Sequence, residues 1–207
     1  MQSLPIILAS RSPRRIALLH EIGLPFEVCP SNAEESNAQG DSPRAIAIHA
    51  AQLKADEVAQ RQASRLVLGA DTIVCLGERV LGKPRDRSEA RDMLRALRGR
   101  WHTVVTGLCL IAAGETPWTA AETTRVHISD FSDEEMERYI ATDEPLDKAG
   151  AYAIQGSAVR FVEEIDGDYH NVVGLPLALL LRGLSRFISV EGITVPPPPD
   201  RFRNPPA

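Results

Sequence analysis

The feature that most limits what this chain can fold into is an apolar run, residues 5–9, that stops at a corner rich in hydroxyls and arginines. Ser10, Ser12, Pro13 and three arginines lie in this corner, and a helical pattern follows. Proline suits a first helical turn, because the N–H that it lacks is not needed there. The free N–H groups of that turn, the helix dipole and the arginines favour a bound anion. Taken alone, the segment fits an anion-binding corner and a serine-capped surface helix equally well.

Size, charge and cysteine usage limit the class of protein. The 207 residues are 43% hydrophobic and 25% charged, which suits one large α/β domain or two closely joined lobes. A net charge of −5 argues against a general nucleic-acid-binding surface. We expect no signal peptide and no membrane span, because no apolar run approaches the ~20 residues that a span needs. Cys29, Cys75 and Cys109 lack C-x-x-C spacing, which predicts reduced thiols and a cytoplasmic location.

Strand and helix patterns mix without strict βαβ alternation. Strands are predicted at residues 6–9, 26–29, 66–70, 73–76, 79–81, 103–112, 119–128 and 159–165. Helices are predicted at residues 14–21, 43–60, 87–98, 133–142 and 175–187. The order favours an α/β fold with a mixed central sheet flanked by helices. We expect a single domain over residues 1–195, and a disordered tail over residues 196–207, where prolines are dense.

Three charged residues are candidates for chemistry. Asp71 follows the predicted strand 66–70, and open α/β sheets place ligand-handling groups at such strand ends. Its carboxylate could bind Mg²⁺ or orient water, although a turn aspartate that binds backbone N–H groups is the commoner case. Lys54 lies on an alanine-rich helix face, and Pro84 makes Lys83 extended. Each lysine could bind phosphate, or be an ordinary surface lysine.

Gln155 ends a small-residue segment that two glycines bracket, within the stretch 147–156. Its planar amide offers a donor and an acceptor, which suits the edge of a nucleobase. The alternative is a strand residue that faces water. The five histidines show no metal-ligand spacing, so a zinc site is not expected. The sequence also lacks the P-loop motif and the G-x-S-x-G motif.

Taken together and in order, these segments resemble the Maf family of nucleoside triphosphate pyrophosphatases. The matching residues are 8–15, 34–35, 54–55, 69–74, 82–84, 106–107, 143–156 and 167–176. The resemblance implies a Maf and ITPase-like fold of two lobes around a cleft, in a family that is often dimeric. It implies hydrolysis between the α- and β-phosphates of a nucleoside triphosphate, which releases the monophosphate and pyrophosphate. It also implies a divalent cation, Mg²⁺ or Mn²⁺.

The resemblance also implies roles for individual residues. Asp71 would be the catalytic proton acceptor, and with Glu34 a metal ligand; whether Glu34 or Glu35 faces the metal stays open. The phosphate-binding residues would be Ser10, Arg15, Lys54 and Lys83. The substrate-specificity residues would be Arg14, Thr72 and Gln155. These three residues resemble those of the family branch that acts on dTTP and UTP. The 7-methyl-GTP branch has tryptophan, glutamine and glutamate at the same three positions.

Two other functions stay open at this point. One is a nucleotide-sensing inhibitor of septum formation with little catalysis, which would use the same cleft. The other is a phosphatase that releases inorganic phosphate. The products distinguish them, because only a pyrophosphatase forms UMP and pyrophosphate from UTP. Removal of non-canonical nucleotides, a house-cleaning role, is compatible with the same chemistry.

Overall fold

The computed structural model describes residues 5–34 and 37–203. Its centre is a seven-stranded mixed sheet of order β2-β1-β3-β5-β6-β7, with β4 paired to β3. The strands are β1 (Ile6–Leu8), β2 (Phe26–Val28), β3 (Val67–Leu76), β4 (Arg79–Leu81), β5 (Trp101–Ile111), β6 (Trp118–Ile128) and β7 (Val162–Asp166). The α-helices are α1 (Pro13–Glu21), α2 (Pro43–Arg61), α3 (Arg87–Leu97), α4 (Asp133–Ile140), α5 (Tyr169–Val173) and α6 (Leu177–Leu184). Short 3-10 helices are η2 (Glu144–Asp147), η3 (Ala149–Ala151), η4 (Ser157–Phe161) and η5 (Asp200–Phe202).

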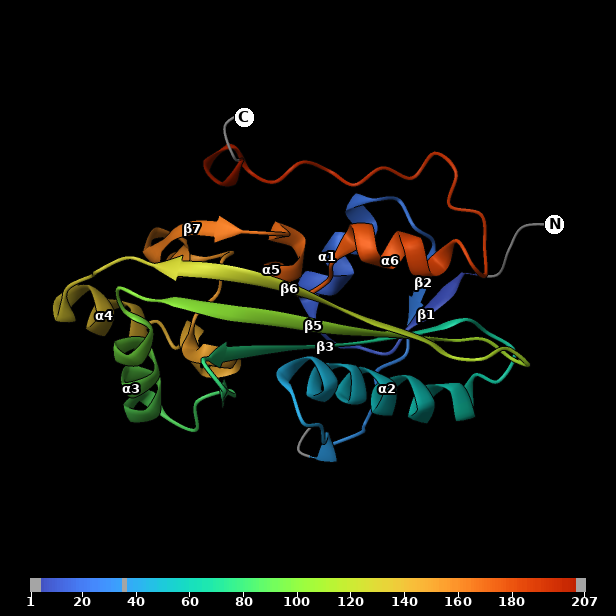
Figure 1. Ribbon diagram of the computed structural model, residues 1–207, viewed down its shortest axis with the longest axis horizontal. Coiled ribbons are helices and arrows are strands. Elements are labelled where there is room, and N and C mark those ends of the chain that lie inside the picture. Colours follow the sequence, from blue (N-terminus) through green and yellow to red (C-terminus); the bar gives the residue numbers. More distant parts are fainter. Residues whose placement is uncertain (1–4, 35–36, 204–207) are drawn as a thin grey trace.

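The sheet is parallel at one end and antiparallel over the rest. β1 runs parallel to β2 and β3, whereas β3, β5, β6 and β7 pair antiparallel in sequence. The long strands β5 and β6 join two groups of elements (Figure 1): α3 and α4 lie at one end, and α1, α2, α6, β1 and β2 at the other. The mixed sheet and the two lobes that the sequence predicted are therefore confirmed. No helix in the described part of the chain is long and apolar enough to cross a membrane.

The helix starts follow the local sequence signals. Ser42 accepts a hydrogen bond from Ala45, and Ser132 forms a complete capping box with Glu135. Asp86 caps α3 by accepting from the backbone N–H of Glu89, but the two residues do not form a capping box. The Glu89 carboxylate instead accepts from the backbone N–H and side chain of Arg85. The starts of α2, α3 and α4 are thus set by residues within one turn.

The structure differs from the predicted elements in β3 and around the last two helices. β3 runs without a break through Asp71, where the sequence predicted a strand end, because Asp71 and Thr72 pair in register with β5. The helix predicted at residues 175–187 is present as α6, but the short helix α5 before it was not predicted; Gly174, with φ +122°, and Pro176 separate the two. Both differences follow from pairing or backbone geometry that the apolar pattern does not encode.

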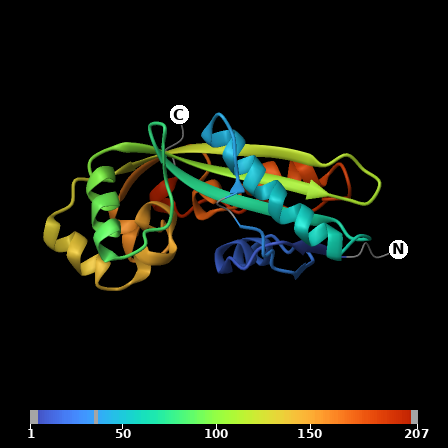
Figure 2. The ribbon, with the colours of Figure 1, turned by 90° about the horizontal axis from the view of Figure 1, so that it is seen from below.

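Helix α2 packs very closely on the sheet (Figure 2). A Cβ atom added at Gly69 of β3 would lie 2.1 Å from the carbonyl oxygen of Ala51, and one at Gly107 of β5 would lie 2.1 Å from that of Ala47. The buried face of α2 is made largely of alanines, which permit this approach. The close contact brings the residue on that face with the longest side chain, Lys54, down onto β3.

We expect Gly69→Ala to lower the free energy of unfolding by about 1–3 kcal/mol, because the new methyl group overlaps the backbone of α2. Urea denaturation measures the change. The matched control is Gly82→Ala, since a Cβ at Gly82 meets nothing within 4 Å and should change stability by less than about 0.5 kcal/mol. Equal stability of the two variants would contradict the close packing of α2.

The C-terminal segment differs from the disorder expected over residues 196–207. Residues 196–203 are described, and they run in an extended path that ends in the turn η5. Phe202 is half-buried and packs against the main hydrophobic core. Proline-rich chain needs no internal hydrogen bonds to stay extended, and Phe202 is one of the residues that dock its end. The remaining residues, 204–207, lie outside the described part of the chain.

Candidate active site

A cavity of about 680 Å³ opens beside the middle of β3. β1 pairs with Val67 and Leu68 of this strand, and β4 pairs with residues 74–76. Along that edge, residues 69–73 have no partner strand within residues 5–34 and 37–203. Side chains from both faces of β3 can therefore reach one cavity, and Asp71 and Thr72 both line it. The open edge explains how a mid-strand aspartate reaches a ligand.

Asp71 forms a buried ion pair with Lys54. Strand alternation places Asp71 on the same face as Gly69, toward α2, and the Lys54 Nζ lies 2.6 Å from the Asp71 Oδ1. Asp71 is 7% exposed and Lys54 8% exposed, so neither is an ordinary surface residue. A charge-assisted hydrogen bond of this length holds both groups in one orientation at the cavity.

Arg15 connects the first corner of the chain to the opposite face of β3. Its guanidinium donates to the Ser10 Oγ at 3.1 Å, to the Thr72 Oγ1 at 3.0 Å and to the carbonyl oxygen of Gly174 at 2.9 Å. Thr72 also lies 2.9 Å from the hydroxyl of Thr106. These contacts give Arg15 a buried, fixed position in which it orients Thr72 and keeps its charge beside the cavity.

The first corner of the chain lies at the cavity, and its helix is also capped by a serine. Ser12 caps α1 by accepting from the backbone N–H of Arg15, and the Ser10 Oγ accepts from the N–H of Ser12 at 3.2 Å. Ser10, Ser12 and Pro13 all line the cavity, so the first turn of α1 faces it. Arg11 also lines the cavity, but its side chain is exposed and donates to Asn32.

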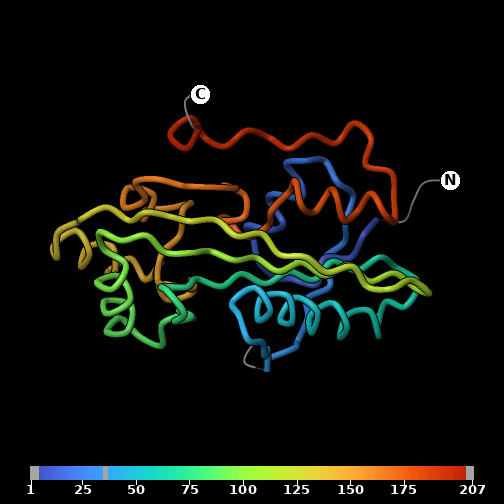
Figure 3. Tube along the Cα trace, in the orientation of Figure 1, coloured from blue at the N-terminus to red at the C-terminus, as the bar shows by residue number. Residues whose placement is uncertain are grey.

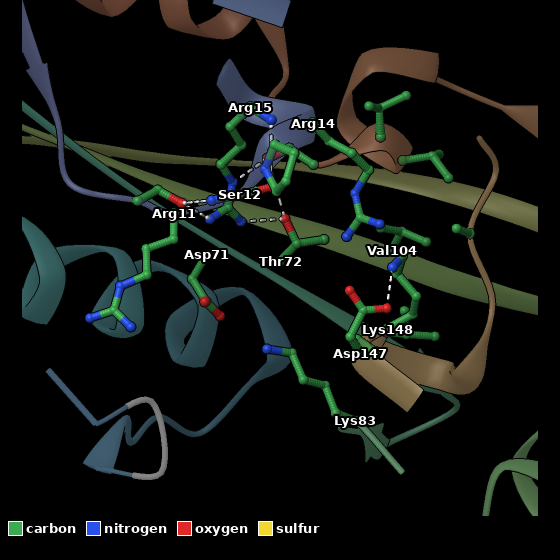
Figure 4. A pocket seen from close by; sticks show the side chains of 18 of the residues that line it. Arg11, Ser12, Arg14, Arg15, Asp71, Thr72, Lys83, Val104, Asp147 and Lys148 are labelled. Atoms are coloured by element: carbon green, nitrogen blue, oxygen red, sulfur yellow. Dashed lines mark hydrogen bonds and ion pairs between the residues drawn. The ribbon is translucent and has the colours of Figure 1, made fainter. Parts of the chain in front are cut away.

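The facing wall of the cavity comes from η2, η3 and the loop after β4 (Figure 4). Arg14 extends toward the ion pair of Asp147 and Lys148, and the Lys83 ammonium points toward Asp71. Burial acts to raise the pKa of Asp147, but the hydrogen bond and charge of Lys148, with the charge of Arg14, lower it overall. Gln155 is exposed and lines the cavity from the loop after η3.

Glu34 is the predicted site residue that the structure does not bring to the cavity. It is exposed and is not a lining residue, although Ser31 and Ala33 are. Glu35, the alternative metal ligand, lies outside the described residues. Within residues 5–34 and 37–203, no group of three or more His, Cys, Asp or Glu side chains gathers closely enough to hold a metal ion. All three cysteines are free.

Sequence reasoning assigned no role to several groups that the structure places at or behind the cavity. They are the ammonium of Lys148, the hydroxyl of Thr106 and the carbonyl oxygen of Gly174. All three fall in segments that match the family, and this match was the signal that could have found them.

The charged residues that line the cavity are mostly cations. The cations are Arg11, Arg14, Arg15, Lys54, Lys83 and Lys148, and the carboxylates are Asp71, Glu144 and Asp147. Such a cavity is typical of a protein that binds a phosphorylated ligand.

Comparison with known proteins assigns the family. The family model of the Maf-like protein matches residues 5–187. A dTTP/UTP pyrophosphatase of Bacillus anthracis is 47% identical over 182 residues, which cover 88% of this chain and 95% of the relative. One from Bacillus cytotoxicus is 49% identical over 183 residues, with the same coverage. The Ham1 protein of Staphylococcus aureus has a similar fold, with a TM-score of 0.53, 16% identity, and coverage of 88% of this chain and 99% of that one.

The chain belongs to the Maf family. The resemblance drawn from its sequence motifs is thereby confirmed.

Proposed function

We propose that this protein hydrolyses dTTP and UTP to their monophosphates and pyrophosphate. The observation that carries the proposal is the buried Asp71–Lys54 pair at a cavity whose charged lining residues are mostly cations. The curated relatives named dTTP/UTP pyrophosphatase support the reaction and the substrates. We extend the proposal to a cytoplasmic, homodimeric enzyme that uses no nucleic acid. The free cysteines suit that location.

The proposed phosphate-binding residues lie in the first corner of the chain, as Ser10 and Arg15, and include Lys54 and Lys83. A triphosphate carries about four negative charges near neutral pH, so it needs concentrated positive charge in a site shielded from water. Lys54 and Lys83 approach Asp71 from α2 and from the loop after β4. Ser10 offers a hydroxyl beside the first turn of α1, and Arg15 contributes charge from behind Ser10.

Asp71 is proposed as the proton acceptor. Water attacks the α-phosphorus as the bond to the bridging oxygen breaks, pyrophosphate leaves with that electron pair, and the water proton passes to the Asp71 carboxylate. The ammonium of Lys54, 2.6 Å away, holds this carboxylate in place. A carboxylate that is fixed beforehand needs little reorganisation when the reaction occurs.

The chain also suits the divalent cation that the family resemblance implies. Mg²⁺ is usually bound through one or two carboxylates together with substrate phosphates, so a protein cluster of three ligands is not required. Asp71 would hold the ion with substrate oxygens, and Glu34 would need to move toward the cavity to join it. When bound, Mg²⁺ or Mn²⁺ would stabilise negative charge on the reacting phosphates.

Base selection is assigned to Arg14, Thr72 and Gln155. Uracil and thymine present an acceptor, O4, beside a donor, N3–H, and one amide can pair with both. Cytosine reverses this pattern. Arg14, Thr72 and Gln155 all line the cavity, and Arg15 holds Thr72 in place by donating to its hydroxyl.

A nucleotide panel with identified products tests the proposed function. The purified protein is incubated with UTP, dTTP, CTP, ATP and GTP and Mg²⁺, and products are separated chromatographically. We expect UMP or dTMP and pyrophosphate, formed preferentially from UTP and dTTP. UDP with inorganic phosphate would instead identify a phosphatase. Nucleotide binding without turnover would favour the nucleotide-sensing alternative.

A further inference from the structure

The C-terminal strap, residues 196–203, is a feature of this chain outside the region that matches the family model, residues 5–187. After α6 it runs back along the outside of the molecule (Figure 3, red). It then ends beside Tyr169, the first residue of α5. The strap therefore returns to the part of the fold that carries one wall of the cavity.

Specific contacts hold the end of the strap in place. The ring of Phe202 stacks on the ring of Tyr169, with 5.7 Å between centroids and 25° between planes. The Arg201 side chain donates to the carbonyl oxygen of Val162 at 2.7 Å. Arg203 closes the turn by pairing with Asp200 at 2.9 Å and donating to the carbonyl oxygen of Pro198 at 3.0 Å. Phe202 is thus presented to Tyr169 by a folded turn.

Tyr169 lies beside a proposed specificity residue, because Tyr169 and Gln155 line the same smaller cavity. Burial raises the pKa of Tyr169, and the Gln155 side chain acts against that rise, as hydrogen bonding to the Tyr169 hydroxyl would. A second, smaller cavity of about 320 Å³ lies behind Gln155, and its lining includes Tyr169 and the strap prolines 197–199. Gln155 lines both cavities, so it stands between the nucleotide cavity and the strap.

The orientation of the Gln155 amide decides which base it can pair with. A free amide can rotate by a half turn and exchange its donor and acceptor, and the two orientations suit uracil and cytosine respectively. If one amide N–H donates to the Tyr169 oxygen, the amide oxygen and the second N–H remain for the base. That arrangement matches the N3–H and O4 groups of uracil and thymine.

We propose that the strap positions Gln155 for base recognition: Phe202 holds the Tyr169 ring, and Tyr169 holds the Gln155 amide in the orientation that pairs with uracil and thymine. Phe202 and Tyr169 are positioning residues, because neither needs to touch the nucleotide. The inference rests on the proposed function and adds to it a selectivity element supplied by the strap.

Kinetics of two variants in the full chain test this inference. Phe202→Ala removes the stacking ring, and Tyr169→Phe removes only the hydroxyl. For each, we expect KM for UTP and dTTP to rise about tenfold with kcat changed less than about twofold. The ratio of kcat/KM for UTP to that for CTP should fall about tenfold. Phe202→Trp should restore this ratio, because it replaces one stacking ring with another.

The matched control is Val195→Ala, which changes an exposed apolar residue just before the strap and should leave all constants unchanged. An unchanged UTP-to-CTP ratio in both variants of an active enzyme would overturn the inference and leave the proposed function standing. An equal loss of kcat for every nucleotide, with a lower Tm, would also overturn it, since it would indicate a merely structural strap. Failure of the wild-type protein to release pyrophosphate from UTP or dTTP would remove the proposed function itself, and the inference with it.

Discussion

Replacing Asp71 by asparagine should lower kcat for UTP by about 10²- to 10⁴-fold, the usual contribution of a general base. The amide keeps the shape of the side chain and can still accept a hydrogen bond from Lys54, which lies 2.6 Å from the carboxylate. It cannot take the proton of the attacking water. Pyrophosphate release at saturating UTP and Mg²⁺ measures the effect.

The control for this variant is Asp143→Asn, the same chemical change at an exposed carboxylate that pairs with Arg87 outside the cavity. It should retain wild-type turnover. Because Asp71→Asn leaves the buried ammonium of Lys54 without its anionic partner at this position, its thermal unfolding must also be followed. Near-normal turnover by a folded Asp71→Asn protein would exclude Asp71 as the proton acceptor.

Replacing Gln155 by glutamate should lower kcat/KM for UTP and dTTP by about 100-fold, equivalent to about 3 kcal/mol of transition-state binding. A carboxylate can still accept from N3–H, but it cannot donate to O4, and it meets that oxygen with like partial charge. The dependence on Mg²⁺ concentration should stay the same, because the proposed metal ligand Asp71 is held by Lys54, whereas the Gln155 side chain interacts with Tyr169. Steady-state kinetics over the nucleotide panel gives both quantities.

Gln60→Glu is the matched control, since Gln60 is exposed near the end of α2 and does not line the cavity. It adds the same charge to the protein and should leave the kinetic constants within about twofold of wild type. A similar loss for UTP, CTP, ATP and GTP in Gln155→Glu would count against base reading. In that case the added charge would be acting on the triphosphate, which all four share.

Much of the local structure could be predicted because it depends on residues close together in the chain. Ser42 and Ser132 begin helices by accepting from N–H groups three residues on, so the signal and its effect lie within one turn. The mixed sheet follows from the order of strand and helix patterns. The family match and most cavity residues were also accessible, since their motifs occur in order along the chain.

The structure differs from the sequence-based expectations where distant residues decide the outcome. Asp71 looked like the end of a strand, yet nine consecutive residues of β3 pair with β5 and carry the strand through it. The proline-dense segment looked disordered, yet Phe202 finds Tyr169, which lies far from it in sequence. Glu34 matched a family motif but lies exposed outside the cavity lining. Neither propensity nor spacing contains these contacts.

By itself, the sequence determined the elements, their caps, the family and the residue types available for binding a nucleotide. Only the tertiary structure decided that α2 approaches Gly69 closely enough to bring Lys54 to Asp71, and that β3 has an open edge between β1 and β4. It also decided that the C-terminal strap reaches Tyr169, which lines a small cavity together with Gln155. The reason is physical: caps and turns depend on nearby backbone groups, whereas a site at a strand edge depends on which elements pack against it.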